Sequence, residues 1–528
     1  MRLSYSLVAR ASTLALAVFA LGCTGGAGDT TTGSGASDTS SCEPGTLECE
    51  CREDQTCDSG LICASKICID DPLVTTTGVS TTTTGSPTTD STTESSTGGV
   101  TSSSGATTSS PECDPAEGVL GNASCGDPSA PFCSLDGVCV DCSGISCAGL
   151  DAGKPVCDLD AVTCVECSAD DASACSGETP ICDVASSTCM GCSEHAQCET
   201  GACNLTTGAC FPPSELWVDK SVAPGGCGIA DGTQGKPFCE IQDAINTVPK
   251  NTPTIIRVVA AASPYTTPVN VLEARFVALL KVGASQARLE VVGASALTVA
   301  KSGNAFVDGL AIGGSSEDRG VVCNQGTVWL DNSKVVGRQD IGVDGVGCTL
   351  AVRRSLIAAN TLGGVNLNTG GSLLLENSFV VNNGDLSSMV GGISLSGIEG
   401  ASIAYSTIVA NEASPGFGTS LHCPFLAQGE VLNSVILAKP GAISISCSVE
   451  IGYSAVDAPK FGGMTNLVVD SYNPLWFKKP ASNDYHLTAT APFKDVALWV
   501  NGQPKVDFDG DMRPSVDGTL DYAGADLP

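Results

Sequence analysis

Short runs of alternating apolar and polar residues recur along the second half of the chain, and each run ends at a serine. These serines lie 22, 23, 28, 28 and 20 residues apart. In every copy, one branched aliphatic residue stands three positions before the serine and another stands two positions after it. The alternation predicts short strands, and the glycines and asparagines between the runs predict turns. The six serines are Ser333, Ser355, Ser378, Ser406, Ser434 and Ser454.

A fixed apolar register with loops of variable length, repeating at this interval, is typical of a solenoid. Leucine-rich repeats have a similar period, but their Leu-x-x-Leu-x-Leu runs are missing. We therefore predict that residues 214–528 form an all-β domain, a right-handed parallel β-helix. The serines, and an asparagine column five positions further on (Asn360, Asn383 and Asn411), should form hydrogen-bonded ladders between coils and carry no chemistry.

The cysteines of this domain give an independent check on the coil length. Cys323 and Cys348 are 25 residues apart, and Cys423 and Cys447 are 24 apart. Residues one coil apart should lie one strand spacing apart, which suits a disulfide. We expect both of these bridges, and a third between Cys227 and Cys239 at the N-terminal cap.

The first residues predict export. Two arginines precede an apolar run at residues 14–21, which is too short to cross a bilayer in the mature protein. Small residues before Cys23 resemble the lipobox of bacterial lipoproteins, which implies that residues 1–22 are a signal peptide and that Cys23 carries the lipid. Thr24 stands where an aspartate would resemble an inner-membrane retention mark, so we expect attachment to the outer membrane or cell surface. A plain signal peptide and a secreted protein are the alternative.

Between the signal and the β-helix, composition predicts a tether, small modules and a stalk. Residues 23–41 are rich in Gly, Ser and Thr, and residues 42–70 hold six cysteines in a module too small for a core of its own. In the region 71–112, 25 of the 36 residues from Thr75 to Ser110 are Ser or Thr. Such a segment cannot bury enough apolar area to fold, so we expect a disordered stalk.

Residues 113–213 contain sixteen of the 29 cysteines, with CxxC pairs that recur every 25 residues. The period predicts an array of small units. Each region of the chain after Cys23 holds an even number of cysteines, which favours disulfides formed in an oxidising compartment. The CxxC spacing also fits zinc knuckles, but zinc needs reduced thiolates. His195 is interpreted as a surface loop residue.

Charge excludes some partners. The chain carries a net charge of −32, and its 25 basic residues are scattered. Nucleic acid is therefore not an expected partner, and the lipid would be the only attachment to a membrane.

Both ends of the large domain resemble known sequences. The opening Leu216-Trp-Val-Asp219, with Asp231-Gly-Thr233 and Ile241-Gln-Asp-Ala-Ile245, is similar to pectin-lyase-like β-helix proteins. Near the end, Asp484-Tyr-His-Leu-Thr488 and Asp507-Phe-Asp-Gly-Asp-Met-Arg513 resemble the terminal motifs of choice-of-anchor Q proteins. The resemblance implies a surface-displayed β-helix and assigns no activity. His486 belongs to the terminal motif, where a packed structural role is expected.

Candidate catalytic residues stand two positions before the serines. Asp331, Arg353 and Glu376 should stack on the outward face, with Asp308 on the preceding coil. Acids beside an arginine could hold a uronic acid or protonate a glycosidic oxygen. The preferred interpretation is a solvated ion-pair ladder. The Asn-Thr-Asp, Gly-His-Gly and Arg-Ile-Lys strings of polygalacturonases are absent.

One acidic run suggests a metal. Asp507, Asp509 and Asp511 alternate and could place carboxylates around calcium. An EF-hand loop would continue with glycine and have a glutamate at its twelfth position, whereas Met512 and Gly518 stand there. A surface turn is the preferred interpretation, and no other cofactor is expected.

These observations rank three functions. The first is a non-catalytic surface lipoprotein that binds a glycan or a protein along the solenoid. The second is a polysaccharide lyase or glycoside hydrolase acting on acidic polysaccharide, and the third is a passive spacer.

Overall fold

The computed structural model divides into two units, residues 1–106 and 107–528. In the first unit, β1 (Leu61–Ala64) and β2 (Ile67–Asp70) pair antiparallel. The signal segment, Cys23, the linker, the stalk and most of the first cysteine module lie outside the described residues, so their assignments stay predictions. The described residues are 61–64, 67–70, 113, 125–222, 229–314, 317–425, 428–463 and 465–528.

Residues 113–210 form four small units, each closed by two interleaved disulfides in which the first cysteine pairs with the third and the second with the fourth. The third and fourth cysteines face each other across a hairpin or an isolated bridge. All sixteen sulfurs are therefore in disulfides, which leaves no thiolate for zinc. The pairs are Cys113–Cys133, Cys125–Cys139, Cys142–Cys157, Cys147–Cys164, Cys167–Cys182, Cys175–Cys189, Cys192–Cys203 and Cys198–Cys210.

The secondary structure of this array is sparse because units of this size bury only their cysteines and a few apolar side chains such as Phe132. Its elements are β3 (Phe132–Cys133), β4 (Cys139–Val140), α1 (Cys147–Leu150), β5 (Val156–Asp158), β6 (Thr163–Val165), β7 (Ile181–Asp183) and β8 (Thr188–Met190).

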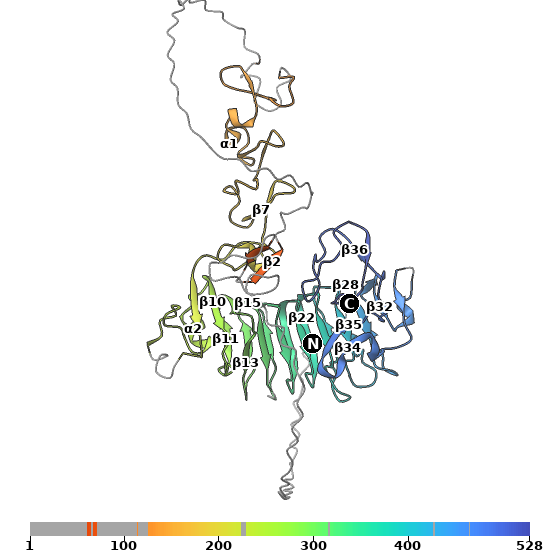
Figure 1. Cartoon of the computed structure of the whole chain (residues 1–528). Helices are drawn as coiled ribbons and strands as arrows, with labels where there is room; N and C mark the ends of the chain where they lie inside the picture. The colour runs from red at the N-terminus through yellow and green to blue at the C-terminus, as the bar shows by residue number, and fades with distance from the viewer. Residues whose placement is uncertain are drawn as a thin grey trace, which may run out of the picture. The chain divides into compact units, whose positions relative to one another are not determined.

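From residue 215 the chain winds into a parallel β-helix, as the repeat predicts (Figure 1). Each complete coil contributes one strand to each of three parallel ladders, the coils at the two ends contribute fewer, and the long strands β20 and β22 take part in two ladders. The first ladder contains β9 (Glu215–Val218), β10 (Pro253–Val259), β12 (Phe276–Val282), β15 (Asn304–Asp308), β18 (Thr327–Asp331), the second halves of β20 (Ile341–Arg353) and β22 (Gly363–Glu376), β25 (Gly400–Ala404), β28 (Gly429–Leu432) and β31 (Glu450–Gly452).

The other two ladders complete the coil. The second contains β13 (Ala287–Glu290), β16 (Leu310–Gly313), β19 (Lys334–Val336), β21 (Leu356–Ala358), β23 (Phe379–Val381), β26 (Thr407–Val409), β29 (Val435–Leu437), β32 (Ala455–Val456) and β33 (Leu467–Val468). The third contains β11 (Val269–Leu272), β14 (Leu297–Ala300), β17 (Val321–Asn324), the first halves of β20 and β22, β24 (Ile393–Ser396), β27 (Leu421–His422) and β30 (Ile445–Ser446).

The marked serines do form a ladder at the turn between the first two sheets. The backbone N–H of Ser333 donates to Oγ of Ser355 on the next coil, and the same bond repeats down to Ser454. The residue before each serine has a positive φ of 42–55°, in the left-handed region. The serine hydroxyls satisfy the backbone of a turn that would otherwise leave buried donors unpaired.

The asparagine column forms a second ladder. Oδ1 of Asn383 accepts the backbone N–H of Asn360 at 3.2 Å, and Oδ1 of Asn411 accepts that of Asn383 at 2.9 Å. On the preceding coil the equivalent position is Arg338, whose N–H donates to Asn360 Oδ1. The Arg338 guanidinium is fully buried and donates to five backbone carbonyls, which makes it the cap of this ladder.

The aliphatic positions of the repeat fill one continuous core inside the coil. At its N-terminal end, α2 (Ile241–Thr247) packs Ile241 and Ile245 against this core. Cys323–Cys348 and Cys423–Cys447 form disulfides with Cα atoms 5.7 and 4.6 Å apart. Cys239 is disulfide-bonded, but Cys227 lies outside the described residues, so their pairing stays a prediction.

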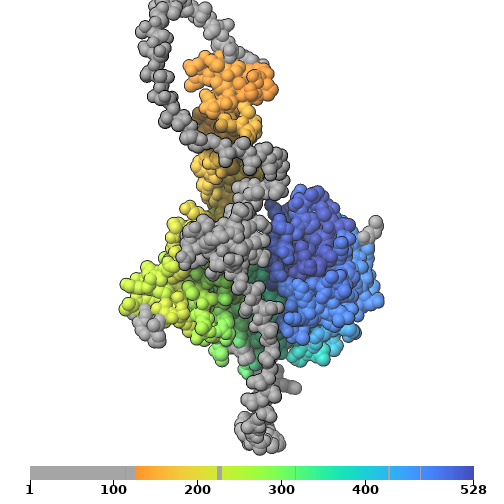
Figure 2. All heavy atoms as spheres, viewed as in Figure 1, coloured from red at the N-terminus to blue at the C-terminus, as the bar shows by residue number. Residues whose placement is uncertain are grey.

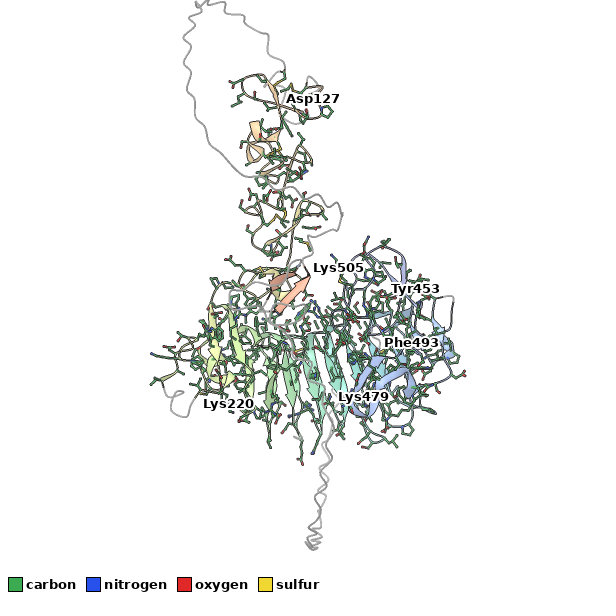
Figure 3. All side chains as sticks on the ribbon, viewed as in Figure 1. Asp127, Lys220, Tyr453, Lys479, Phe493 and Lys505 are labelled. Atoms are coloured by element: carbon green, nitrogen blue, oxygen red, sulfur yellow. A yellow bond between two sulfur atoms is a disulfide. The ribbon has the colours of Figure 1, made fainter. Side chains whose placement is uncertain are left out.

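The C-terminal segment, residues 469–528, packs along the flank of the β-helix (Figures 1 and 2). A second apolar cluster joins outward side chains of the second ladder, such as Phe379 and Val435, to Tyr485, Phe493 and Trp499 of this segment. Phe493 is labelled in Figure 3. The segment contains β34 (Phe477–Lys479), β35 (Asp484–Leu487), β36 (Ala497–Trp499) and β37 (Thr519–Asp521).

Candidate functional site

The four candidate catalytic residues stack in one column of the first ladder. Asp308 pairs in register with Asp331, Asp331 with Arg353, and Arg353 with Glu376. The column ends at Ala404 on the following coil. Their alignment follows from strand register, because equivalent residues of parallel strands lie side by side.

The column is not the solvated ladder that the sequence suggested. Asp331 is only 2% exposed, and Arg354 holds both of its carboxylate oxygens, with Nε–Oδ1 at 3.0 Å and Nη2–Oδ2 at 2.7 Å. Arg353 Nε lies 3.7 Å from a carboxylate oxygen of Glu376. A buried carboxylate needs such partners because desolvation otherwise opposes its charge.

The fourth disulfide unit, residues 192–210, covers this column. Glu194 forms ion pairs with both Arg353 and Arg354, and Arg353 Nη1 donates to the carbonyl of Ser193 at 2.9 Å. Beside these ion pairs lies an apolar contact in which Phe211 packs against Phe276 and Phe306, with ring centroids 5.1 and 5.9 Å apart. The unit and the sheet therefore share a mixed apolar and charged interface.

His195 belongs to this interface, and the prediction of a surface loop residue is wrong. Its Nδ1 accepts the N–H of Cys203 at 3.0 Å, which leaves the proton of the neutral ring on Nε2. Nε2 is buried without a hydrogen-bond partner, and the ring interacts electrostatically with Asp308 and Asp331. Burial lowers the pKa of His195, so the neutral ring is favoured.

Two acids of the column are less acidic than usual. Burial is the main cause that raises the pKa of Asp308, and the charge of Asp331 adds to it. Burial likewise raises the pKa of Glu376, although the Arg353 charge partly offsets the effect. A carboxyl group with a raised pKa and a neighbouring histidine form a pair suited to proton transfer. Here the histidine belongs to the docked unit that covers the acids, and Asp331 is paired with Arg354.

An open groove lies further along the same sheet. It has a volume of about 510 Å³ and is lined by Ser372, Ser402, Gln428, Glu430 and Glu450, among others. Glu430 and Glu450 are register partners on adjacent coils.

The acidic run of the terminal motif, which suggested a calcium loop, forms a turn around Asp507. Asp507 is fully buried, and its Oδ1 accepts the N–H groups of Asp509, Gly510 and Asp511. Its Oδ2 accepts the N–H of Leu527 at 2.9 Å. The carboxylate of Asp507 therefore stabilises a backbone turn.

A different set of metal-binding atoms converges nearby. His486, Asp509 and Asp526 each offer one ligand atom, and these atoms lie within 4.8 Å of one another. His486 also packs against the rings of Phe379 and Phe508, which agrees with the structural role expected for it.

Sequence reasoning missed the buried Arg513 of the same motif. Its guanidinium lies 3.9 Å from the ring centroid of Tyr405, and Nη1 donates to Asp521 at 3.0 Å. Nη2 donates to Asn377 Oδ1 and to the carbonyl of Gly524. The motif thus serves to fasten the C-terminal segment to the coils.

Fold and site together define a parallel β-helix protein with a disulfide-bonded array before it. A family of unknown function, DUF8331, matches residues 102–216, which span the array and reach the start of β9. A search of curated proteins found no match. Within the part of the chain that the structure describes, no helix is long and apolar enough to cross a membrane.

Three solved structures match the chain, and one of them is pectate lyase Pel9A. The two chains are 12% identical with a TM-score of 0.38, and the match covers 59% of this chain and 96% of that one.

Proposed function

We propose that this chain is an exported, lipid-anchored surface protein whose β-helix is non-catalytic and serves adhesion by binding a glycan. One observation carries the proposal: the acid column that could act in a lyase or hydrolase is closed by residues 192–210, whereas the groove beside it is open. A β-helix enzyme needs its acids in contact with the polysaccharide.

The groove fits a neutral glycan better than an acidic one. Ser372, Ser402 and Gln428 offer the hydroxyl and amide groups that pair with sugar hydroxyls. Glu430 and Glu450 would accept hydrogen bonds from a neutral sugar but would repel a uronate. The net charge of −32 on the whole chain also disfavours binding of an acidic polysaccharide.

Retention and cleavage assays on residues 24–528 test this proposal. We expect retention on neutral polysaccharides, no cleavage, and loss of retention when Ser402→Trp fills the groove. Thr361→Trp, at an exposed turn outside the groove, is the matched control. Cleavage of an acidic polysaccharide that disappears in Asp331→Asn would overturn the proposal in favour of the enzyme.

The anchor is tested separately in a bacterial expression host. We expect the full chain in the membrane fraction, labelled by a fatty acid, and Cys23→Ser in the soluble exported fraction. Equal membrane association of both chains would contradict the lipid anchor.

A further inference from the structure

Three segments that are far apart in sequence meet in the C-terminal part of the structure. His486 lies on β35, Asp509 lies in the turn that Asp507 holds, and Asp526 is two residues from the end. We propose that His486, Asp509 and Asp526 bind a divalent transition-metal ion, Zn²⁺ being the best fit, and that the ion fastens these segments together.

The histidine is oriented as a metal-binding histidine would be. Its Nδ1 is 2.6 Å from Oδ1 of Asp484, and this contact fixes the ring and leaves Nε2 facing the other two carboxylates. A carboxylate on the far nitrogen is the usual outer partner of a histidine that binds metal, since it raises the basicity of the binding nitrogen.

Nε2 itself makes no hydrogen bond within the described part of the chain. The atom is buried, and although Oδ2 of Asp509 lies 3.2 Å away, no hydrogen bond of good geometry forms. Two ligands with metal bonds of about 2.0–2.2 Å in a tetrahedral site lie roughly 3.3 Å apart. The observed separation of 3.2 Å is compatible with two ligands of one ion.

The electrostatics also favour a cation. Asp526 is 2% exposed, and its Oδ2 accepts the N–H of Leu487 at 2.9 Å. Asp509 and Asp526 therefore place two carboxyl groups beside one imidazole, and Asp507 lies close enough to interact with Asp526. A divalent ion would neutralise the negative charge gathered there.

The donor set selects the class of metal. An imidazole with two carboxylates suits Zn²⁺ and other transition metals, whereas calcium prefers six or more oxygens. The described cysteines from residue 125 onward are in disulfides, so they offer no competing thiolates. Asp509 has a side chain that is 51% exposed, which gives the ion a path from solvent.

Zinc titration of residues 24–528, freed of metal by a chelator, tests the site at pH 7.5. We expect one Zn²⁺ per chain by calorimetry, together with a rise in Tm. Asp509→Asn should weaken binding at least about tenfold, because a ligand is lost. Asp511→Asn is the matched control, since this exposed aspartate lies in the same turn but outside the group, and it should leave binding unchanged.

Two further variants separate binding from folding. Asp484→Asn removes only the outer partner and should weaken Zn²⁺ binding about ten- to a hundredfold while the metal-free Tm changes little. The Co²⁺-loaded chain should show the absorption of nitrogen and oxygen ligands, and His486→Gln should abolish it. Wild-type binding no tighter than that of Asp509→Asn, or a thiolate spectrum, would overturn the proposal.

Discussion

Arg354 binds both carboxylate oxygens of Asp331 on the preceding coil, at 3.0 and 2.7 Å, and also pairs with Glu194 of the fourth disulfide unit. This arginine therefore joins the sheet to the unit that covers it. It stands in the turn after β20, with a φ of 42°.

Replacing Arg354 should loosen this interface. Arg354→Ala leaves the buried carboxylate of Asp331 without its main partner, which costs about 3–5 kcal/mol when a buried pair is broken. We expect that loss in the free energy of unfolding from denaturant titration, and faster proteolysis near residues 211–214. Arg288→Ala is the control, because Arg288 and Glu290 form an exposed pair worth about 0–1 kcal/mol. An equal loss of stability in the two variants would contradict the role of Arg354 in joining the sheet to the fourth disulfide unit.

The asparagine ladder should be as sensitive as the apolar core. Asn383 is fully buried, and Asn383→Ala leaves the carbonyl of Ile357 and the backbone N–H of Asn360 without these partners. At about 1–3 kcal/mol for each unsatisfied buried group, we expect a loss of roughly 3 kcal/mol by denaturant unfolding. Asn383→Asp should be worse, because a carboxylate would then face carbonyl oxygens.

Asn304→Ala provides the comparison for this ladder. Asn304 is partly exposed and donates only to the nearby carbonyl of Ser302. We expect a change within about 0.5 kcal/mol. A similar loss in Asn304→Ala and Asn383→Ala would show that the ladder has no special role.

Arg513 should be needed to dock the C-terminal segment. Arg513→Leu leaves the buried Asp521 carboxylate without its ion-pair partner, and we expect the free energy of unfolding to fall by about 3–5 kcal/mol. Adding Asp521→Asn should recover part of it, because the uncompensated charge is then gone. Thermal unfolding of the single and double variants checks this, and a double variant less stable than the single one would contradict it.

Glu376 should make stability depend on pH. Burial raises the pKa of Glu376 in the folded chain, so its ionised form is less favourable there than in the unfolded chain. Glu376 therefore does not destabilise the folded chain below the unfolded pKa near 4.5, where the carboxyl group is protonated in both states. The free energy of unfolding falls as the pH rises from there through the folded pKa. Glu376→Gln should flatten this part of the Tm-against-pH curve, whereas Glu399→Gln, at an exposed site, should not.

Much of the coil could be predicted because its information is local and periodic. The serine and asparagine columns and the aliphatic positions recur at one period, and the cysteine spacing agrees with the same coil length. The register that places Asp308, Asp331, Arg353 and Glu376 in one column follows directly from that period.

The burial of this column could not be read from the repeat. Its cover is Glu194 and His195, which lie more than a hundred residues before Asp331 in a separate repeat. The sequence of a disulfide unit of this size has no periodic apolar pattern from which a contact with the sheet could be predicted.

The lateral packing of the C-terminal segment did leave a signal. Strands β23, β26 and β29 read Phe-Val-Val, Thr-Ile-Val and Val-Ile-Leu, and all nine residues are buried. Strands with apolar residues on both faces are covered on both faces. The strict alternation expected of a sheet open to solvent is missing in this ladder.

The flank contact changes how the solenoid can come apart. In a simple solenoid each coil touches only its neighbours, so the last coils can peel away one at a time. Here the side chain of Asn377 donates to the carbonyl of Val506, and that of Asn433 donates to the carbonyl of Leu498. The C-terminal segment is therefore hydrogen-bonded to coils that are not adjacent. Proteolytic cleavage that releases the C-terminal segment would therefore expose the outward apolar side chains of several coils of the second ladder at once. Such a chain should aggregate before its terminal coils unfold one by one.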